Sequence, residues 1–237
     1  MRKNICDMNE ELFVSMMLKK ELVPLDAARV AEERRYYEMT PSVEGKDAAI
    51  RDLAEVYADA GAYDDAIAVY QEAIQNPIFK EYRAGYYFRI GQLNEHKEDF
   101  DSALVAYLQS LNEEEFDAYG RYWQHNNVAF CYLMKKDFVS AEKHCLIAFE
   151  ADDEFRRRWI HVEERLRWNV WKNMGVAMEH TGRYKEAASF YTTAIKLSDG
   201  SDRAVVHLRR LLNRHPDLAV YWKESVEDLL IYYNVIV

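Results

Sequence analysis

The residues best able to carry chemistry are few and do not form a catalytic pattern. The three cysteines, Cys6, Cys131 and Cys145, make neither a CxxC pair nor another metal-binding spacing, and an odd number suits a disulfide framework poorly. The seven histidines are scattered, without metal-ligand spacing to another His or to a Cys on one helical face. The sequence has no glycine-rich phosphate loop, no HExxH and no GxSxG. We therefore expect reduced and inert thiols, no metal, no cofactor and no enzymatic activity.

The charge balance argues against nucleic-acid binding. Forty-one acidic residues outnumber 31 Lys and Arg, which gives a net charge of −10 and a pI near 5.3. Such a surface repels a phosphate backbone. The most basic local stretch lies within 149–168, and it is either a solvated face paired with neighbouring carboxylates or a docking surface for an acidic partner. Its arginines are Arg156, Arg157, Arg158, Arg165 and Arg167.

The composition favours a helical protein that does not enter a membrane. Apolar residues make up 49% and charged residues 30%, as in a folded domain, while Gly (8) and Pro (4) are too scarce for the many turns of a sheet protein. The apolar run LFVSMML (12–18) is far shorter than a membrane span. We expect a cytoplasmic protein.

A recurring 14-residue pattern indicates which elements position the side chains. GAYDDAIAVYQEAI (61–74) returns as EDFDSALVAYLQSL (98–111), KDFVSAEKHCLIAF (136–149) and GRYKEAASFYTTAI (182–195). Each copy has an aromatic at its third place, Ala at its sixth and usually Tyr at its tenth. The sixth-place alanines, Ala66, Ala103, Ala141 and Ala187, are spaced by 37, 38 and 46 residues, which is typical of stacked supersecondary units.

Each copy follows a segment with helical periodicity. IRDLAEVYADAG (50–61) and WKNMGVAMEHTG (171–182) place apolar or small residues at i, i+3, i+4 and i+7, and 87–98 and 125–136 are compatible with the same pattern. Each unit is therefore predicted to be a helix, a short turn and a second helix. Small residues such as Gly91 and Gly175 would let the two helices approach closely, and the aromatics at 63, 100, 138 and 184 would wedge between units.

The pattern resembles that of the tetratricopeptide repeat family. The first and fourth units carry most of the family positions, the second has Asn94 where Tyr is expected, and the third is looser, with His125 and Cys145 at two of its positions. The matches of the first unit are Ile50, Leu53, Ala54, Tyr57, Gly61, Tyr63, Ala66, Tyr70, Ala73 and Pro77. The resemblance implies an all-α, right-handed solenoid of helix-turn-helix units.

The remaining segments are assigned around this array. Residues 1–45 are predicted to be a degenerate helical pair and a linker, 46–200 to hold four repeats (about 47–80, 84–117, 122–155 and 168–200), and 201–237 to form capping helices. The last residues, IYYNVIV, are apolar, so they either tuck back onto the array or meet another chain.

The resemblance also implies a ligand site. Tetratricopeptide arrays bind extended or helical peptides along the concave face, which is lined by the first helix of each unit. The corresponding residues here mix amide, aromatic and basic groups, which suit a peptide backbone and apolar anchors. The predicted partner-binding residues are Arg51, Phe88, Gln92, Trp123, Asn126, Asn127, Phe130, Asn169, Lys172 and Asn173. A carboxylate clamp of the co-chaperone type is not predicted, because Glu55, Asn169 and Asn173 stand where its polar and cationic groups belong.

These observations favour a protein–protein interaction scaffold that binds a peptide or partner protein on the concave face. Two alternatives stay open. One is a peptide-sensing regulator, and the other is a repeat subunit that self-assembles or supports a larger complex.

Overall fold

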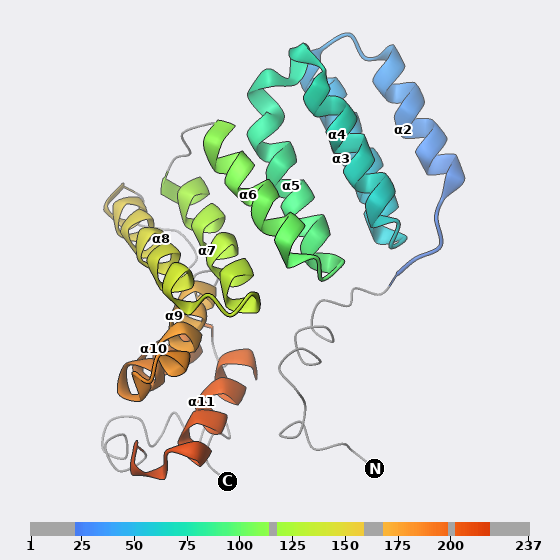
Figure 1. Cartoon of the computed structure of the whole chain (residues 1–237). Helices are drawn as coiled ribbons and strands as arrows, with labels where there is room; N and C mark the ends of the chain where they lie inside the picture. Colours follow the sequence, from blue (N-terminus) through green and yellow to red (C-terminus); the bar gives the residue numbers. More distant parts are fainter. Residues whose placement is uncertain (1–21, 114–117, 159–167, 199–201, 219–237) are drawn as a thin grey trace. The chain divides into compact units, whose positions relative to one another are not determined.

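The computed structural model describes residues 22–113, 118–158, 168–198 and 202–218, and all their regular secondary structure is helical. The described helices form two compact units, which we call the amino-terminal unit (α2–α6) and the carboxy-terminal unit (α7–α11). Figure 1 labels their helices. Among the described residues, no helix has the length and apolar character needed to cross a bilayer.

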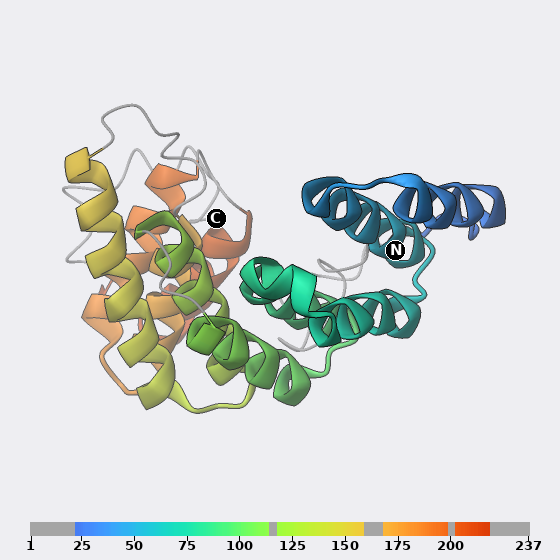
Figure 2. The same ribbon diagram turned by 90° about the horizontal axis from the view of Figure 1, so that it is seen from above.

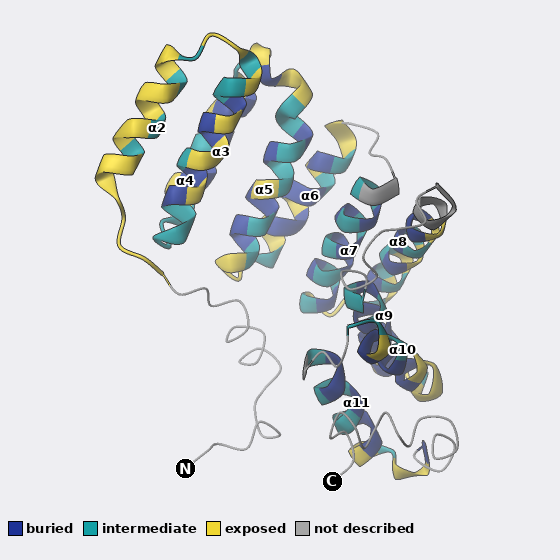
Figure 3. Cartoon of the chain, turned by 180° about the vertical axis from the view of Figure 1, so that it is seen from behind, coloured by how far each residue is buried: buried dark blue, intermediate teal, exposed yellow. Residues whose placement is uncertain are grey.

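The amino-terminal unit stacks antiparallel helices along one direction. Its elements are α2 (Ala27–Met39), α3 (Val43–Asp59), α4 (Tyr63–Gln75), the 3-10 helix η2 (Pro77–Tyr82), α5 (Arg83–His96) and α6 (Phe100–Glu113). Side-chain caps begin the first two helices, where Asp26 accepts from two backbone N–H groups of α2 and Ser42 accepts from Gly45 N at 3.1 Å. Helix α2 has no buried residue and is almost entirely exposed in Figure 3.

The carboxy-terminal unit has the same hairpin construction. Its elements are α7 (Ala118–Met134), α8 (Phe138–Arg158), α9 (Trp168–His180), α10 (Tyr184–Leu197) and α11 (Asp202–Arg214). Figure 2 shows from above how α7 and α8 lie side by side as one hairpin. In Figure 3, α9 is the most deeply buried helix of this unit, in agreement with an unbroken buried run from Lys172 to Glu179.

The four hairpins turn in the same way. In each, a residue with positive φ ends the first helix: Gly61 (74°), Glu98 (60°), Lys136 (61°) and Gly182 (78°). In each turn the following backbone N–H donates to a carbonyl five residues back, as from Asp99 N to Asn94 O at 2.9 Å. Gly accepts this conformation at little cost, whereas Glu98 and Lys136 adopt it because the packed helices on either side fix the turn.

The repeated small residues lie where the two helices of a hairpin come closest. The four sixth-place alanines, Ala66, Ala103, Ala141 and Ala187, are completely buried. A Cβ added at Gly91 would lie 2.5 Å from Cε1 of Tyr107, and one at Gly175 would lie 2.5 Å from Cε1 of Tyr191. The predicted fold class, an all-α stack of repeated helical hairpins, is confirmed. The predicted domain limits at 45, 46–200 and 201–237 stay predictions.

Candidate binding groove

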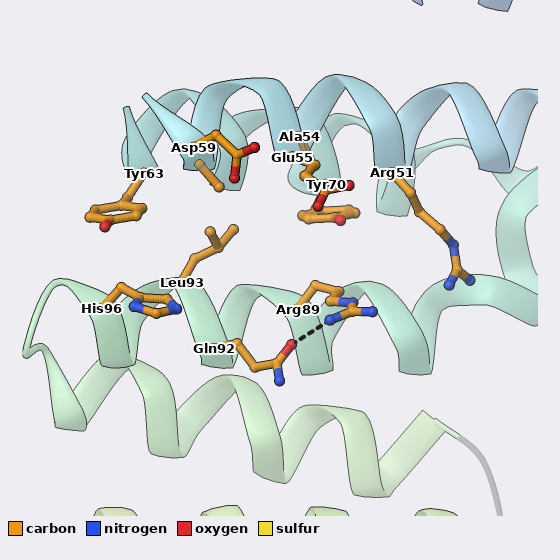
Figure 4. Close-up of a pocket in the computed structure, with 11 residues that line it drawn as sticks. Arg51, Ala54, Glu55, Asp59, Tyr63, Tyr70, Arg89, Gln92, Leu93 and His96 are labelled. Atoms are coloured by element: carbon orange, nitrogen blue, oxygen red, sulfur yellow. Dashed lines mark hydrogen bonds between the residues drawn. The ribbon is translucent and has the colours of Figure 1, made fainter. Parts of the chain in front are cut away.

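The first helices of two neighbouring hairpins, α3 and α5, enclose a groove of about 310 Å³ in the amino-terminal unit. Figure 4 shows side chains from both helices pointing into this space, with aromatic residues of α4 behind them. We call it the α3–α5 groove. Its lining consists of Arg51, Ala54, Glu55, Ala58, Asp59, Tyr63, Tyr70, Arg89, Gln92, Leu93 and His96.

A buried carboxylate links the two walls. Arg51 Nε donates to Asp47 Oδ1 at 3.0 Å within α3, and the hydroxyl of Tyr86 on α5 donates to the same oxygen at 2.8 Å. Tyr86 is completely buried. Burial is the main cause that raises the pKa of the Tyr86 hydroxyl, and the hydrogen bond to Asp47 is the second, so this hydroxyl keeps its proton. Because Asp47 bonds both helices, it fixes the spacing of the groove walls and aims the Arg51 guanidinium along them.

Tyr70 forms the back of the groove. Its side chain is 4% exposed, and its ring centroid lies 5.4 Å from that of Tyr86. Burial raises the pKa of Tyr70, with Arg89 and Arg51 acting in the opposite direction. The phenol therefore stays protonated and can donate or accept a hydrogen bond at the base of the groove.

An aromatic stack closes the other end of the groove. The rings of Tyr63 and His96 lie 5.6 Å apart at an interplanar angle of 12°. Equivalent stacked ring pairs occur in the carboxy-terminal unit, where Phe138 stacks on His180 and Tyr184 stacks on His215. These contacts place Tyr63 and Phe138 against the next hairpin and Tyr184 against the end of α11, in line with the predicted wedging of aromatics between units.

Two of the three residues predicted for this unit line the groove. Arg51 and Gln92 face into it, whereas Phe88 lies against the ring of Tyr107 on α6, 5.5 Å between centroids. The predicted site misses several lining residues, including Asp59, Tyr70 and His96. It also misses Arg89, whose Nη1 donates to Gln92 Oε1 at 2.8 Å. Its signal was available, because 85, 89, 92 and 96 form one i, i+4, i+7, i+11 stripe.

Five of the seven predicted residues of the carboxy-terminal unit fall into two clusters. Asn173 Nδ2 donates to Asn126 Oδ1 at 3.1 Å, and Asn126 Nδ2 donates to Asn127 Oδ1 at 3.2 Å. Lys172 Nζ lies 5.6 Å from the ring centroid of Phe130.

These residues differ in how much solvent they meet. Asn126 and Asn173 are 5% and 2% exposed, and Lys172 is 9% exposed, so packed atoms of this unit cover all three. Trp123 and Asn169 are half-buried, and Trp123 lies edge-on to Tyr122. Because Asn126, Lys172 and Asn173 are covered, the α3–α5 groove is the more accessible candidate.

In the carboxy-terminal unit, two histidine side chains pack against each other and against a tyrosine ring. His125 and His144, from α7 and α8, bring their Nδ1 atoms to 2.8 Å, and Tyr132 stacks on His144. Burial, with His144 and Arg121 nearby, lowers the pKa of His125 to about 4. No group of three His, Cys, Asp or Glu side chains that could hold a metal occurs in the described ranges.

The structure describes two of the three cysteines, but not the side chains of the basic stretch. Cys131 and Cys145 are buried and are not in a disulfide, and burial raises the pKa of the Cys145 thiol to about 12. The side chains of the basic stretch at 156–167 lie outside what the structure describes.

Comparison with known proteins agrees with the repeat architecture. Residues 51–118 match the family model for the tetratricopeptide repeat. The chain is 28% identical over 142 residues to TPR repeat-containing protein MJ1428 of Methanocaldococcus jannaschii. That match covers 58% of this chain and 23% of the relative, so the chain spans less than a quarter of the length of that protein.

Two solved structures share the fold. BtubC (BKLC) from P. vanneervenii superposes with a TM-score of 0.62 at 16% identity, covering 90% of this chain and 87% of that chain. The APC/C hetero-tetramer Cut9-Hcn1 gives a TM-score of 0.58 at 19% identity, covering 82% of this chain and 36% of the other. At these identities the likeness concerns the fold alone.

Proposed function

We propose that this chain, whose residues 51–118 match the tetratricopeptide repeat model, is a protein-interaction module whose α3–α5 groove binds a segment of a partner protein. The observation that carries the proposal is the groove itself. Two helices that a buried Asp47 holds together present a guanidinium, an amide and a tyrosine hydroxyl around about 310 Å³. Preformed concave sites with a few converging polar groups are where proteins bind ligands.

The groove chemistry suits a polypeptide. Gln92 offers both a donor and an acceptor, and Tyr70 offers a hydroxyl, which together can pair with backbone N–H and C=O groups. Leu93 and the methyl groups of Ala54 and Ala58 supply apolar contact between these polar groups. Among the residues predicted in the carboxy-terminal unit, the half-buried Trp123, Asn127, Phe130 and Asn169 are candidate contacts of a separate surface there.

A matched pair of double variants tests the proposal. Arg89→Ala/Gln92→Ala removes two groove side chains, whereas Arg35→Ala/Gln75→Ala removes the same residue types from exposed positions of α2 and α4 outside the groove. Affinity capture from a lysate of the source cells, read by quantitative mass spectrometry, should show partners retained by the wild type and the control and lost by the groove variant. Equal capture by both variants would refute the groove as the binding site.

The same material addresses the two alternatives. Size-exclusion chromatography with light scattering reports self-assembly, and a strict monomer at high concentration removes the self-assembling subunit. A peptide-sensing regulator should gain thermal stability with a short peptide, because ligand that binds only the folded state raises the melting temperature.

A further inference from the structure

The charges of the α3–α5 groove are arranged by sign along its length. Arg51, Glu55 and Asp59 follow one another at four-residue intervals on α3 and therefore share a face. Each interval advances about 6 Å along the helix axis. Figure 4 shows Arg51 at one end, Asp59 and His96 on opposite walls at the other, and Glu55 and Arg89 on opposite walls in between. The groove is bipolar, with guanidinium groups toward one end and carboxylates toward the other.

Two of these charges lack a counter-ion among the residues that the structure describes. Arg51 is compensated by Asp47, with Nε 3.0 Å from Oδ2. Arg89 bonds only the neutral amide of Gln92 and makes no ion pair within the described residues. Glu55, exposed on the opposite wall, makes neither a hydrogen bond nor an ion pair in the same part of the chain.

The uncompensated charges face the same space. Arg89 lowers and Glu55 raises the pKa of Tyr70, whose hydroxyl lies at the back of the groove. A ligand lying over Tyr70 therefore meets a cation from one wall and an anion from the other.

We propose that the groove recognises an extended peptide segment carrying one acidic and one basic side chain two to four residues apart. This rests on the function proposed above. The acidic side chain pairs with Arg51 and Arg89 at the guanidinium end, and the basic side chain pairs with Glu55 and with Asp59 one turn beyond. The cationic and acidic positions along α3 lie about 6 to 12 Å apart, and an extended chain advances about 3.3 Å per residue, which gives the spacing.

Peptide segments whose charged side chains all have the same sign fit the α3–α5 groove less well. A run of acidic residues would bring carboxylates against Glu55 and Asp59, and a run of basic residues would bring cations against Arg51 and Arg89. Like charges at these distances repel, whereas a mixed segment gains two favourable pairs.

Fluorescence anisotropy with defined peptides tests this inference on the full chain. The probes are capped, fluorescein-labelled octapeptides of Ala and Ser that carry Glu and Lys two, three or four positions apart. The comparison peptides carry Glu and Glu, Lys and Lys, or Gln and Gln at the same positions. We expect the mixed peptides to bind about fivefold more tightly than each comparison peptide, from two pairs of about 0.5 kcal/mol. The preference should disappear in 0.5 M salt.

Two charge reversals make the test specific. Arg89→Glu makes this part of the groove mainly acidic and should shift its preference to the Lys-Lys peptide, while Glu55→Lys should shift it to the Glu-Glu peptide. Arg35→Glu, the same change on exposed α2, should keep the mixed preference. Circular dichroism confirms that each variant is folded.

The outcomes separate this inference from the proposed function. If no peptide binds, or if the preference ignores the charge reversals, the bipolar recognition is wrong. The proposed function fails separately, when Arg89→Ala/Gln92→Ala retains the cellular partner. A partner lost from that variant but unaffected by Arg89→Glu and Glu55→Lys would leave the interaction site standing and overturn only its charge selectivity.

Discussion

Two glycines on the same helix should respond to the same substitution with opposite signs. Gly85 and Gly91 both lie within α5. A Cβ at Gly85 would meet only Arg51 Nη2, at 3.8 Å, which is an ordinary contact. A Cβ at Gly91 would lie 2.5 Å from Cε1 of Tyr107, whose ring is completely buried and whose hydroxyl donates to Glu95 Oε1 at 2.7 Å. The environment, and not the helix, therefore decides the outcome.

Three contributions determine how much each substitution changes the free energy of unfolding. Replacing Gly by Ala inside a helix adds about 0.5–1 kcal/mol to the free energy of unfolding at both positions. At Gly91 the ring of Tyr107 must move, and overpacking of this kind costs about 1–3 kcal/mol. Displacing the ring also weakens its hydrogen bond to the Glu95 carboxylate, which contributes about 1.5–3 kcal/mol when lost. We expect Gly85→Ala to gain about 0.5–1 kcal/mol and Gly91→Ala to lose about 1–3 kcal/mol.

Urea unfolding followed by circular dichroism measures both variants against the wild type. If the unfolding has more than one phase, the phase shared by both variants is compared, because repeat arrays can lose cooperativity. Gly175→Ala, with Tyr191 at the same distance, should repeat the loss in the carboxy-terminal unit. If Gly91→Ala proved as stable as Gly85→Ala, close approach of the two helices would not explain the small residue at this repeat position.

Three further predictions concern the carboxy-terminal unit. Folding lowers the pKa of His125 to about 4, mainly through burial and then through His144, so the unfolded chain takes up the proton first. The free energy of unfolding should therefore fall as pH drops from about 6.5 to 4, and His125→Phe should flatten that slope in urea titrations. Glu179→Gln, which removes the buried charge that Arg210 contacts at 3.1 Å, should destabilise the unit by about 2–3 kcal/mol and increase hydrogen exchange in α11. Cys145, with its pKa raised to about 12 by burial, should react with a thiol reagent only after unfolding, and rapid labelling of the native protein would contradict its packing.

The fold could be predicted because its determinants recur in the sequence. Each hairpin needs a small residue, an alanine and an aromatic at fixed places, and their recurrence is visible as a spacing of 37 to 46 residues. The four turn residues with positive φ show that the residue type alone does not always indicate a turn. Gly61 and Gly182 indicate their turns in the sequence. Glu98 and Lys136 adopt the same conformation only because equivalent helices pack on both sides.

The candidate site was harder to predict because it depends on rotation and on distant partners. Phe88 and Arg89 are adjacent on α5, and a helix rotates by about 100° per residue, so an assignment shifted by one position exchanges a packed aromatic for a groove cation. The histidines appear scattered because their stacking partners come from other helices, as with His96 on Tyr63. The burial of Asn173 likewise depends on packing that no local pattern reports.

Arg51 illustrates why binding and stability must be separated in this groove. It lines the groove, yet its Nε bonds the buried Asp47 that also accepts from Tyr86 on α5. Arg51→Ala should therefore weaken any ligand and also lower the free energy of unfolding by about 1–3 kcal/mol, because a buried carboxylate loses a charge-assisted hydrogen bond. Arg89 bonds only Gln92, so Arg89→Ala should change stability by less than about 0.5 kcal/mol. Urea titrations of the two single variants distinguish these roles. If Arg51→Ala were as stable as Arg89→Ala, the Arg51–Asp47 pair within α3 would contribute nothing measurable to the stability of the fold.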